Sequence, residues 1–306
     1  MNILLTGGAG YIGTVLAKNL HKSKHVDKVI IYDNLSRQNY NLFLGHFIEN
    51  RENITFVNGD ILDLRKLGKL LKEVDVVYHL AARVSTPFAS VDPHFHEQVN
   101  HWGTAELVSA VEESNVSKFI YTSSTSVYGA SDDYVNEESI PNPKTFYGIS
   151  KLRGEDHVRR LMKKMDAYIL RCANVYGYSS SMRFDAVINR FMFDANFTNK
   201  ISIHGNGKQF RAFIHVNILV KVLIEILEKE VPSGIYNVVD RNMQILDLVD
   251  IVKEIYPALE FIFINQHLDL RQMKVEADSL LRKYIDYQNP ETLKEELLYF
   301  KERFSF

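Results

Sequence analysis

The sequence contains one cysteine, Cys172, so the chain cannot form an internal disulfide or a cysteine-based metal cluster. It also lacks an excess of either charge, because 36 Lys and Arg are balanced by 38 Asp and Glu. A chain without a basic excess has few cations to neutralise the phosphates of a nucleic acid, and this argues against nucleic-acid binding. The lack of disulfides indicates a reducing compartment, and we expect the protein in the cytoplasm.

Long apolar stretches are missing as well. No segment reaches the roughly 18 uninterrupted apolar residues of a membrane-spanning helix. The apolar run that follows Met1 is too short for a signal peptide. Hydrophobic residues make up 46% of the 306 residues and charged residues 24%, an ordinary globular balance. We therefore expect a globular protein of one large or two smaller domains, with no membrane partner.

Short apolar runs alternate with helix-length segments through the first half of the chain. Each run is rich in Ile, Val, Leu, Tyr and Phe and ends at a polar residue, which is typical of a buried parallel strand. The predicted strands are 2–6, 28–33, 54–57, 74–80, 118–122 and 167–171, and the predicted helices are 11–21, 62–73, 95–114 and 147–165. This alternation predicts an α/β fold, a doubly wound parallel sheet of the Rossmann type with helices on both faces.

The alternation ends after Arg171. Residues 174–183 are rich in Gly, Ser and Tyr and predict a loop. The remaining predictions are helices at 184–198, 218–229 and 246–255, strands at 201–203 and 234–239, and a polar helical tail at 278–306. We expect a Rossmann domain from residues 1–172 and about 211–240, and a smaller discontinuous α/β lobe from about 173–210 and 241–306.

A glycine-rich loop follows the first predicted strand. It satisfies G-x-G-x-x-G at Gly8, Gly10 and Gly13, and G-x-x-G-x-x-G at Gly7, Gly10 and Gly13. In such a loop one glycine makes a tight turn, one lets the backbone approach a pyrophosphate, and the last lets the helix pack close to the strand. The alternative is a glycine turn with a structural role only. The strand before the loop and the helix after it favour a dinucleotide site.

Carboxylates end the second and third predicted strands. Asp33 lies 20 residues past Gly13, where it can accept both ribose hydroxyls of NAD and would repel the 2′-phosphate of NADP. Arg37 is the one nearby residue that would suit NADP. Asp60 can bond an adenine amino group while Ile61 packs on the ring, or it can cap the next helix.

One tyrosine of the 16 has a lysine four residues later: Tyr147 is followed by Lys151. On a helix these two positions share a face. A phenol of pKa ~10 is a poor base, but a nearby ammonium and a positive nicotinamide lower that pKa by favouring the phenolate. The pair can then take a hydroxyl proton as hydride leaves the carbon. Because Y-x-x-x-K is a loose pattern, chance is the alternative.

A serine-rich segment ends the fifth predicted strand. Ser124 lies in Ser-Ser-Thr-Ser-Val-Tyr-Gly at 123–129, 23 residues before Tyr147. Ligands bind at the carboxyl ends of parallel strands, so a hydroxyl there can hold the reacting oxygen beside the phenol. The alternative is a loop whose hydroxyls only cap a turn.

Together these segments resemble the extended short-chain dehydrogenase/reductase superfamily, and within it the NAD-dependent nucleotide-sugar 4-epimerases, dehydratases and their relatives. The segments occur in family order within residues 1–240: TGGAGYIG at 6–13, YDNLS at 32–36, GDI at 59–61, HLAA at 79–82, NHWGT at 100–104, TSSTSVYG at 122–129, YGISK at 147–151, LRCANVYG at 170–177 and RAFIHV at 211–216. The resemblance implies an NAD-dependent enzyme of carbohydrate biosynthesis that acts on a nucleotide-diphosphate sugar.

The resemblance also implies roles for individual residues. The catalytic residues are Ser124, Tyr147 and Lys151. The residues beside NAD are Gly7, Gly10, Tyr11, Ile12, Gly13, Asp33, Asn34, Asp60, Ile61, Leu80, Ala81, Ala82, Asn100, Thr122, Tyr147 and Lys151. The substrate contacts are Ser85, Ser124, Asn174, Arg183, Arg211 and Arg271. A planar guanidinium such as that of Arg211 suits a pyrophosphate, although a surface arginine is the alternative. Helices 95–114 and 147–165 are expected to form a homodimer interface.

Three departures from the family pattern narrow the reaction. Ser126 occupies the place where the 4,6-dehydratases and the glycosyluronate decarboxylases have an acidic residue, so dehydration is not expected. Ala212 replaces the aspartate of the usual Arg-Asp-Phe, and residues 269–273 replace Arg-Pro-Gly-Asp. Cys172 is not placed like the acid-base cysteine of the 3,5-epimerase/4-reductases. The nucleotide and the outcome (C4 epimerase, C4 dehydrogenase or 4-ketoreductase) stay open.

Two other classes of function are alternatives to this one. The first is a dehydrogenase of a small amino-alcohol such as threonine, and Arg211 with the segment 211–216 argues against it. The second is a regulatory or scaffold protein that binds NAD without turnover, and the intact Ser-Tyr-Lys set argues against it. His79, His94, His96 and His101 lie near one another in sequence, but no acidic or cysteine partner completes a site, so no metal is expected.

Overall fold

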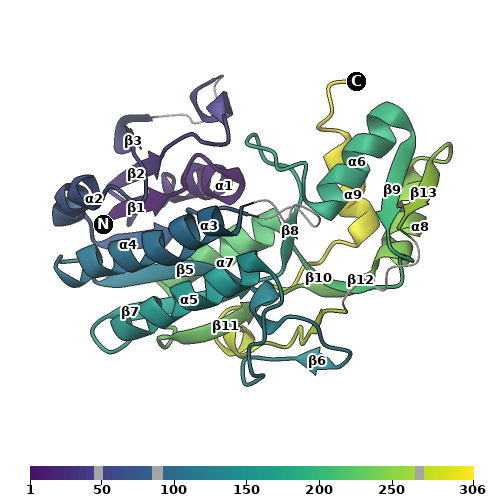
Figure 1. Ribbon diagram of the computed structural model, residues 1–306. Coiled ribbons are helices and arrows are strands. Elements are labelled where there is room, and N and C mark those ends of the chain that lie inside the picture. The colour runs from purple at the N-terminus through teal and green to yellow at the C-terminus, as the bar shows by residue number, and fades with distance from the viewer. Residues whose placement is uncertain (45–50, 85–91, 266–271) are drawn as a thin grey trace.

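The computed structural model describes residues 1–44, 51–84, 92–265 and 272–306 (Figure 1). Its centre is a parallel seven-stranded sheet with strand order β11-β7-β5-β4-β1-β2-β3. These strands are β1 Asn2–Thr6, β2 Lys28–Asp33, β3 Ile54–Asn58, β4 Val76–His79, β5 Lys118–Ser124, β7 Asp166–Cys172 and β11 Gly234–Val238. Each corresponds to a strand predicted from the sequence, and the doubly wound parallel sheet is confirmed.

Alternating side chains of the sheet build a separate hydrophobic core on each face. Ile3 and Leu5 point to one face, and Leu4 points to the other. The first face is covered by helices α1 and α7, and the second by α2, α4 and α5. These helices are α1 Tyr11–Leu20, α2 Leu64–Leu70, α4 Gly103–Glu112, α5 Phe146–Leu161 and α7 Val216–Glu228. Full burial of one such aliphatic side chain contributes about 1.5–3 kcal/mol, so the two cores hold the layers together.

The strand order reverses at β1. The chain runs outward from β1 to β2 and β3, and then returns to place β4, β5, β7 and β11 on the other side. Neighbouring loops at such a reversal leave the sheet in opposite directions and open a crevice at the carboxyl ends of the strands. The crevice beside β1 and β4 is therefore where a ligand is expected.

The second half of the chain adds a smaller lobe, on the right of Figure 1. It contains a three-stranded sheet of order β12-β10-β8 and a parallel pair of β9 and β13. Helices α6, α8 and α9 share one hydrophobic core with these strands. The elements are β8 Asn174–Tyr176, α6 Val187–Thr198, β9 Lys200–His204, β10 Phe210–His215, β12 Arg241–Gln244, α8 Ile245–Ile255, β13 Glu260–Ile264 and α9 Leu293–Lys301. A short pair joins β6 Tyr134–Val135 to β14 Lys274–Val275.

Three sequence predictions differ from the structure. The predicted loop at 174–183 begins with strand β8, which forms because β10 pairs with it. In the predicted helical tail only 293–301 is α-helical, because the capping box of Thr292 and Glu295 starts the helix there. The predicted helix 95–114 is divided into α3 Pro93–His96, a π-helical stretch Glu97–Trp102 and α4. Such π-helical stretches are often found beside functional sites.

The residue boundaries of the two predicted domains stay a prediction. Strand β11 belongs to the large sheet, and helix α7 packs on one face of that sheet. Strand β10, from the same predicted segment, belongs to the small sheet. Within the described ranges, no helix has both the length and the apolar character needed to cross a membrane.

Candidate active site

The glycine loop brings three backbone segments unusually close together. Gly7 has a φ of +71°, and a Cβ there would lie 2.6 Å from the backbone nitrogen of Ala81 in the loop after β4. A Cβ on Gly13 would lie 2.6 Å from the carbonyl oxygen of Gly7. The first turn of α1 thus begins directly against the end of β1, and its free backbone N–H groups make this a place for an anion.

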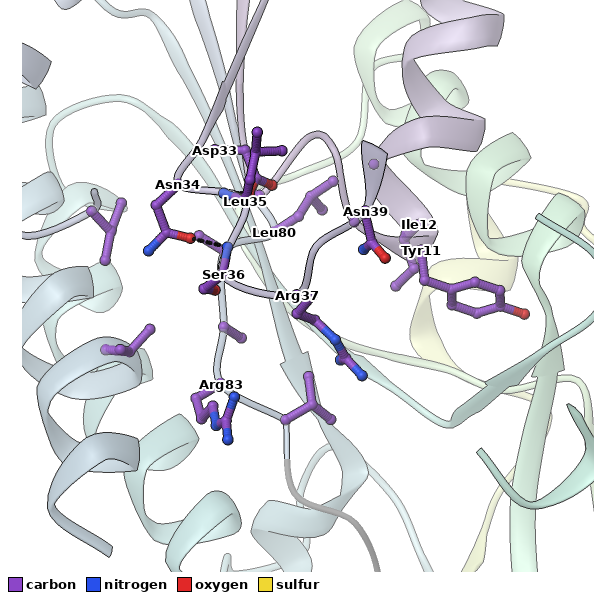
Figure 2. A pocket seen from close by; sticks show the side chains of 18 of the residues that line it. Tyr11, Ile12, Asp33, Asn34, Leu35, Ser36, Arg37, Asn39, Leu80 and Arg83 are labelled. Carbon is purple, nitrogen blue, oxygen red and sulfur yellow. Dashed lines mark hydrogen bonds between the residues drawn. The ribbon is translucent and has the colours of Figure 1, made fainter. Parts of the chain in front are cut away.

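A cavity of about 280 Å³ opens above the glycine loop (Figure 2). It lies at the carboxyl ends of β1, β2, β3 and β4, where the strand order reverses. Twelve of the predicted cofactor residues line it: Gly7, Gly10, Tyr11, Ile12, Gly13, Asp33, Asn34, Asp60, Ile61, Leu80, Ala81 and Ala82. The loop, the strand ends and their carboxylates therefore surround one space of the size of a ligand site.

Asp33 is held in the cavity by two backbone donors. Its Oδ2 accepts from the Ala9 N–H at 3.1 Å and its Oδ1 from the Leu35 N–H at 2.8 Å. Burial raises the pKa of the Asp33 carboxyl, and the two hydrogen bonds oppose that rise. Asp60 receives a hydrogen bond from the Asn34 amide at 2.8 Å. The N-cap of helix α2 is Asp63 and not Asp60, so the alternative prediction of a capping role for Asp60 is wrong.

Arg37 lines the same cavity but is paired with an acid from the small lobe. Its Nη2 lies 3.4 Å from Oδ1 of Asp185, and the same oxygen accepts from Nε of Arg183 at 2.8 Å. The guanidinium that would suit an NADP phosphate is thus partly neutralised by Asp185. No sequence spacing links Asp185 to Arg37, so this contact could not be predicted from the sequence.

The segment Gly177–Asp185 joins the small lobe to the cofactor side of the molecule. The Tyr11 hydroxyl donates to the Gly177 carbonyl at 2.6 Å, and the Ser179 hydroxyl donates to the Tyr11 carbonyl at 2.9 Å. The Thr14 hydroxyl donates to the Ser181 hydroxyl at 2.9 Å. This segment, which carries Arg183, is therefore bonded to the first turn of α1.

Ser124, Tyr147 and Lys151 come together although they are distant in sequence. Ser124 is the last residue of β5; its proximity lowers the pKa of Tyr147, and its own hydroxyl donates to that of Ser126 at 3.1 Å. Tyr147 is in the first turn of α5, which begins because the Thr145 hydroxyl accepts from the Gly148 N–H at 3.0 Å. Lys151 follows one turn later and is only 2% exposed. The end of β5 and the first turns of α5 thus bring the three residues near one another.

Burial opposes the charged forms of both α5 residues. It raises the pKa of Tyr147, while the positive charge of Arg183 and the nearby Ser124 hydroxyl lower it. Burial also lowers the pKa of Lys151 to about 7, against the effects of Cys172 and Glu155. The predicted effect of Lys151 on the pKa of Tyr147 stays a prediction. The Lys151 ammonium lies 4.3 Å from the centre of the Tyr121 ring.

Comparison with known proteins agrees with this geometry. Residues 3–238 match the NAD dependent epimerase/dehydratase family. The chain belongs to this family. It is 32% identical to a human dTDP-D-glucose 4,6-dehydratase over 294 residues, which cover 94% of this chain and 78% of that protein. It is also 32% identical to a UDP-glucose 4-epimerase of Mycolicibacterium smegmatis over 231 residues, 73% of this chain and 72% of that one.

A solved structure of a family member has the same fold. The UDP-glucuronic acid 4-epimerase from Bacillus cereus, in complex with UDP-glucuronic acid and NAD, superposes with a TM-score of 0.86 at 27% identity. The match covers 99% of this chain and 98% of that one. The residues of the present cavity fit NAD, the family's cofactor. The glycine loop lets a ligand approach its backbone where any Cβ would stand in the way, and the Asp33 carboxylate at the end of β2 is a group that can accept ribose hydroxyls.

Asn100 and Thr122, which were predicted to lie beside NAD, support the cavity of this chain from outside its wall. The Asn100 amide, in the π-helical stretch, accepts from the Arg83 N–H at 2.7 Å and donates to the Ser150 hydroxyl at 3.0 Å. The Thr122 hydroxyl donates to the His79 carbonyl at 3.1 Å. Neither residue is among those that line the cavity. Both hold the loop after β4 against α5 or β5.

The predicted substrate residues fall into separate places. Arg183 lines the cavity. Asn174 on β8 and Arg211 on β10 lie in adjacent strands of the small sheet, and the Asn174 amide donates to the Ala212 carbonyl at 2.9 Å. Ser85 and Arg271 lie outside the described residues. The small sheet thus presents Asn174 and Arg211 together, at a different position from Arg183.

Sequence reasoning missed several residues of the cavity wall. Those without a prediction include Arg83, Val84, Phe95, Val99 and Asp185. Arg83 and Val84 directly follow the motif at 79–82, so extending that motif would have found them. Phe95 and Val99 lie on α3 and the π-helical stretch, whose course the sequence pattern did not show.

The histidines that cluster in sequence separate in space. The His96 ring centre lies 6.3 Å from that of Tyr147. His101 forms a hydrogen bond with His157 through their Nε2 atoms at 3.1 Å. His79 is buried between the hydroxyls of Thr6 and Thr104. In the part of the chain that the structure describes, no three His, Cys, Asp or Glu side chains are arranged to hold a metal ion.

Proposed function

We propose that this family member oxidises C4 of a nucleotide-linked sugar with NAD and acts as a C4 epimerase or C4 dehydrogenase. The observation that carries the proposal is the meeting of Ser124, Tyr147 and Lys151 where β5 ends and α5 begins. When bound, NAD accepts the hydride from the sugar carbon. The remaining work of the reaction, which is proton transfer and orientation, falls to the side chains of this chain.

Tyr147 is the base in this proposal. As phenolate it takes the proton of the C4 hydroxyl, and the Ser124 hydroxyl holds the reacting oxygen beside it. The Lys151 ammonium holds the nicotinamide ribose. Its location one turn along α5 keeps its positive charge near the phenol. A developing charge in a buried site is stabilised more strongly by such fixed groups than it would be in water.

The substrate class is argued from two arginines of the predicted substrate set. Arg183 at the cavity and Arg211 on β10 offer guanidinium groups, which suit a diphosphate. A small amino-alcohol has no phosphate to occupy them. The relatives whose names include a nucleotide sugar support the same class. We propose a nucleoside-diphosphate sugar as substrate, with the nucleotide and the sugar undetermined.

The segment after Ser124 argues against elimination of water. Thr125 and Ser126 carry hydroxyls, and the Ser124 hydroxyl donates to that of Ser126 at 3.1 Å. Loss of water from C5 and C6 needs an acid and a base beyond the C4 base, and no carboxylate lies in this segment. The chain resembles a protein named as a 4,6-dehydratase, so dehydration is the second candidate reaction.

Product analysis separates the candidates. The wild-type protein is incubated with NAD and UDP-glucose, UDP-glucuronic acid or dTDP-glucose in deuterated water, and products are followed by NMR with NADH absorbance. We expect exchange of configuration at C4 with a transient NADH signal, or a persistent NADH signal for a dehydrogenase. We expect no deuterium at C5. A 6-deoxy-4-keto product would overturn the use of Ser126, and absence of any turnover would overturn the proposal.

Asp33→Ala should weaken NAD binding by roughly 10–100-fold, since a hydrogen bond to a charged group is worth about 1.5–3 kcal/mol. NADP binding should weaken less or improve, because its phosphate no longer meets a carboxylate. Isothermal titration of both cofactors measures the two effects. Arg37→Gln is the control, because that guanidinium is already paired with Asp185 and its loss should change NAD affinity little. A wild-type protein that prefers NADP would contradict the assignment.

We propose that the protein is a homodimer in the cytoplasm. The resemblance supports an interface on the helices that contain α4 and α5. Trp102, at the end of the π-helical stretch before α4, is 57% exposed, as expected of a side chain that a second copy covers. Cys172 is buried and is the single cysteine of the sequence, in keeping with a reducing compartment. Light scattering of the purified protein tests the dimer.

A further inference from the structure

A buried ion pair lies directly behind the catalytic set. Glu155 on α5 and Arg171 on β7 are 0% and 1% exposed. Oε1 of Glu155 accepts from Nε of Arg171 at 3.0 Å, and Oε2 accepts from Nη2 at 2.7 Å. Two parallel hydrogen bonds of this kind fix the relative orientation of both side chains. Neither residue has a role predicted from the sequence.

The pair holds both ends of the segment that carries Ser124. The Ser123 hydroxyl donates to Oε1 of Glu155 at 2.6 Å. At the other end, Nη1 of Arg171 donates to the Tyr128 hydroxyl at 3.0 Å, and that hydroxyl donates to the Asn237 amide oxygen on β11 at 2.8 Å. Residues 123–128 are therefore fixed before and after Ser124.

The same carboxylate fixes the helix that carries the other two catalytic residues. Glu155 lies one turn past Lys151 and two turns past Tyr147 on α5. The helix, the end of β5 and the end of β7 thus share one bonded centre. A shift of α5 along its axis would break both the Ser123 and the Arg171 contacts.

We propose that Glu155 and Arg171 are positioning residues, which set the distance between the Ser124 hydroxyl and the Tyr147 phenol; this inference rests on the proposed function. Stability alone is a weak reason for such a pair. Removing two charges from water costs about as much as their attraction returns, and neutral replacements of whole pairs are often tolerated. Misplacement of a reacting group by about 1 Å, in contrast, can cost about 10²-fold in rate.

Glu155 has a second effect through its charge. It raises the pKa of Lys151 against the lowering by burial. The other groups that face Lys151 are Cys172 on β7, His79 on β4 and the Tyr121 ring on β5. Without the carboxylate, the Lys151 ammonium loses its proton at a lower pH. Because the cation is the active form, the fall of activity on the alkaline side then begins at a lower pH.

The test replaces both charges with amides, Glu155→Gln with Arg171→Gln, which removes the ion pair and its two parallel hydrogen bonds. We expect kcat to fall about 10-fold or more, KM for the nucleotide sugar and the affinity for NAD to change less than about threefold, and the alkaline limb to move to lower pH. The matched control is Glu296→Gln with Arg241→Gln. That pair is also largely buried, at 3.2 Å, but lies in the small lobe. Its kcat and pH profile should stay those of the wild type.

Smaller variants keep the proposal testable if the double variant fails to fold. Ser123→Ala removes only one hydroxyl contact and should lower kcat several-fold with the affinity for NAD unchanged. Tyr128→Phe should do the same. A folded double variant with wild-type kcat and pH profile overturns the proposal, and so does wild-type kcat in both small variants. Loss of all turnover in the wild type would instead overturn the proposed function, so the two failures are distinct.

Discussion

Tyr147→Phe is expected to lower turnover of the nucleotide sugar at least ~10²-fold, the low end for a lost general base. The fold should be unchanged, because the ring keeps its place beside His96 in the first turn of α5. Affinity for NAD should also be unchanged, since Tyr147 is outside the lining of the cofactor cavity. Steady-state kinetics with the best substrate, a thermal melt and a cofactor titration measure the three quantities.

Tyr134→Phe is the matched control, because that phenol is on β6 and 56% exposed. It should keep the turnover of the wild type. If Tyr147→Phe retains a third or more of wild-type kcat, Tyr147 is not the base and the mechanism must be assigned to another group. A parallel loss of NAD affinity would instead place the phenol in cofactor binding.

Gly7→Ala should reduce NAD affinity by about 10²-fold and lower the melting temperature of the protein. A residue with a side chain pays roughly 1–2 kcal/mol for the left-handed backbone at this position. The new Cβ would also lie 2.6 Å from the Ala81 backbone nitrogen, so the loops after β1 and β4 must separate. That separation distorts the glycine loop that is proposed to bind the pyrophosphate. Calorimetric titration and a thermal melt measure the two effects.

Gly68→Ala provides the control. Gly68 is in helix α2, and nothing lies within 4 Å of a Cβ added there. Alanine favours a helix over glycine by roughly 0.5–1 kcal/mol, so this variant should bind NAD normally and melt slightly higher. Equal NAD affinity in Gly7→Ala and the wild type would show that the loop is only a structural turn, the alternative weighed for this motif.

The large sheet could be predicted from the sequence because its signals are local. Strands such as β1 and β2 are continuous apolar runs, and the helices between them carry their own periodic pattern. Strand β8 has no such signal. Its three residues are a strand because β10, far along the chain, pairs with them. The helix start at Thr292 had a local signal in Thr-x-x-Glu at 292–295, but the sequence prediction extended the helix over the whole polar tail.

The candidate site shows the same division. Residues within motifs, such as Asp33 and the Tyr147–Lys151 pair, were found because their spacing along one strand or helix is fixed. Asp185 and Arg171 were missed as functional residues because their partners, Arg37 and Glu155, are brought to them only by the folded chain. Contacts of this kind depend on three-dimensional packing, and no side-chain periodicity of 2 or 3.6 residues predicts them.

The hydrogen bonds of segment Gly177–Asp185 affect how the protein unfolds. They join the small lobe to the first turn of α1, and Asp185 adds a contact to the loop after β2. The two halves cannot unfold one after the other, because unfolding of the small lobe would expose helix α1, which covers one face of the large sheet. Heating should therefore give a single calorimetric transition whose van't Hoff and measured enthalpies agree. The two halves that the sequence suggested would be, thermodynamically, one cooperative unit.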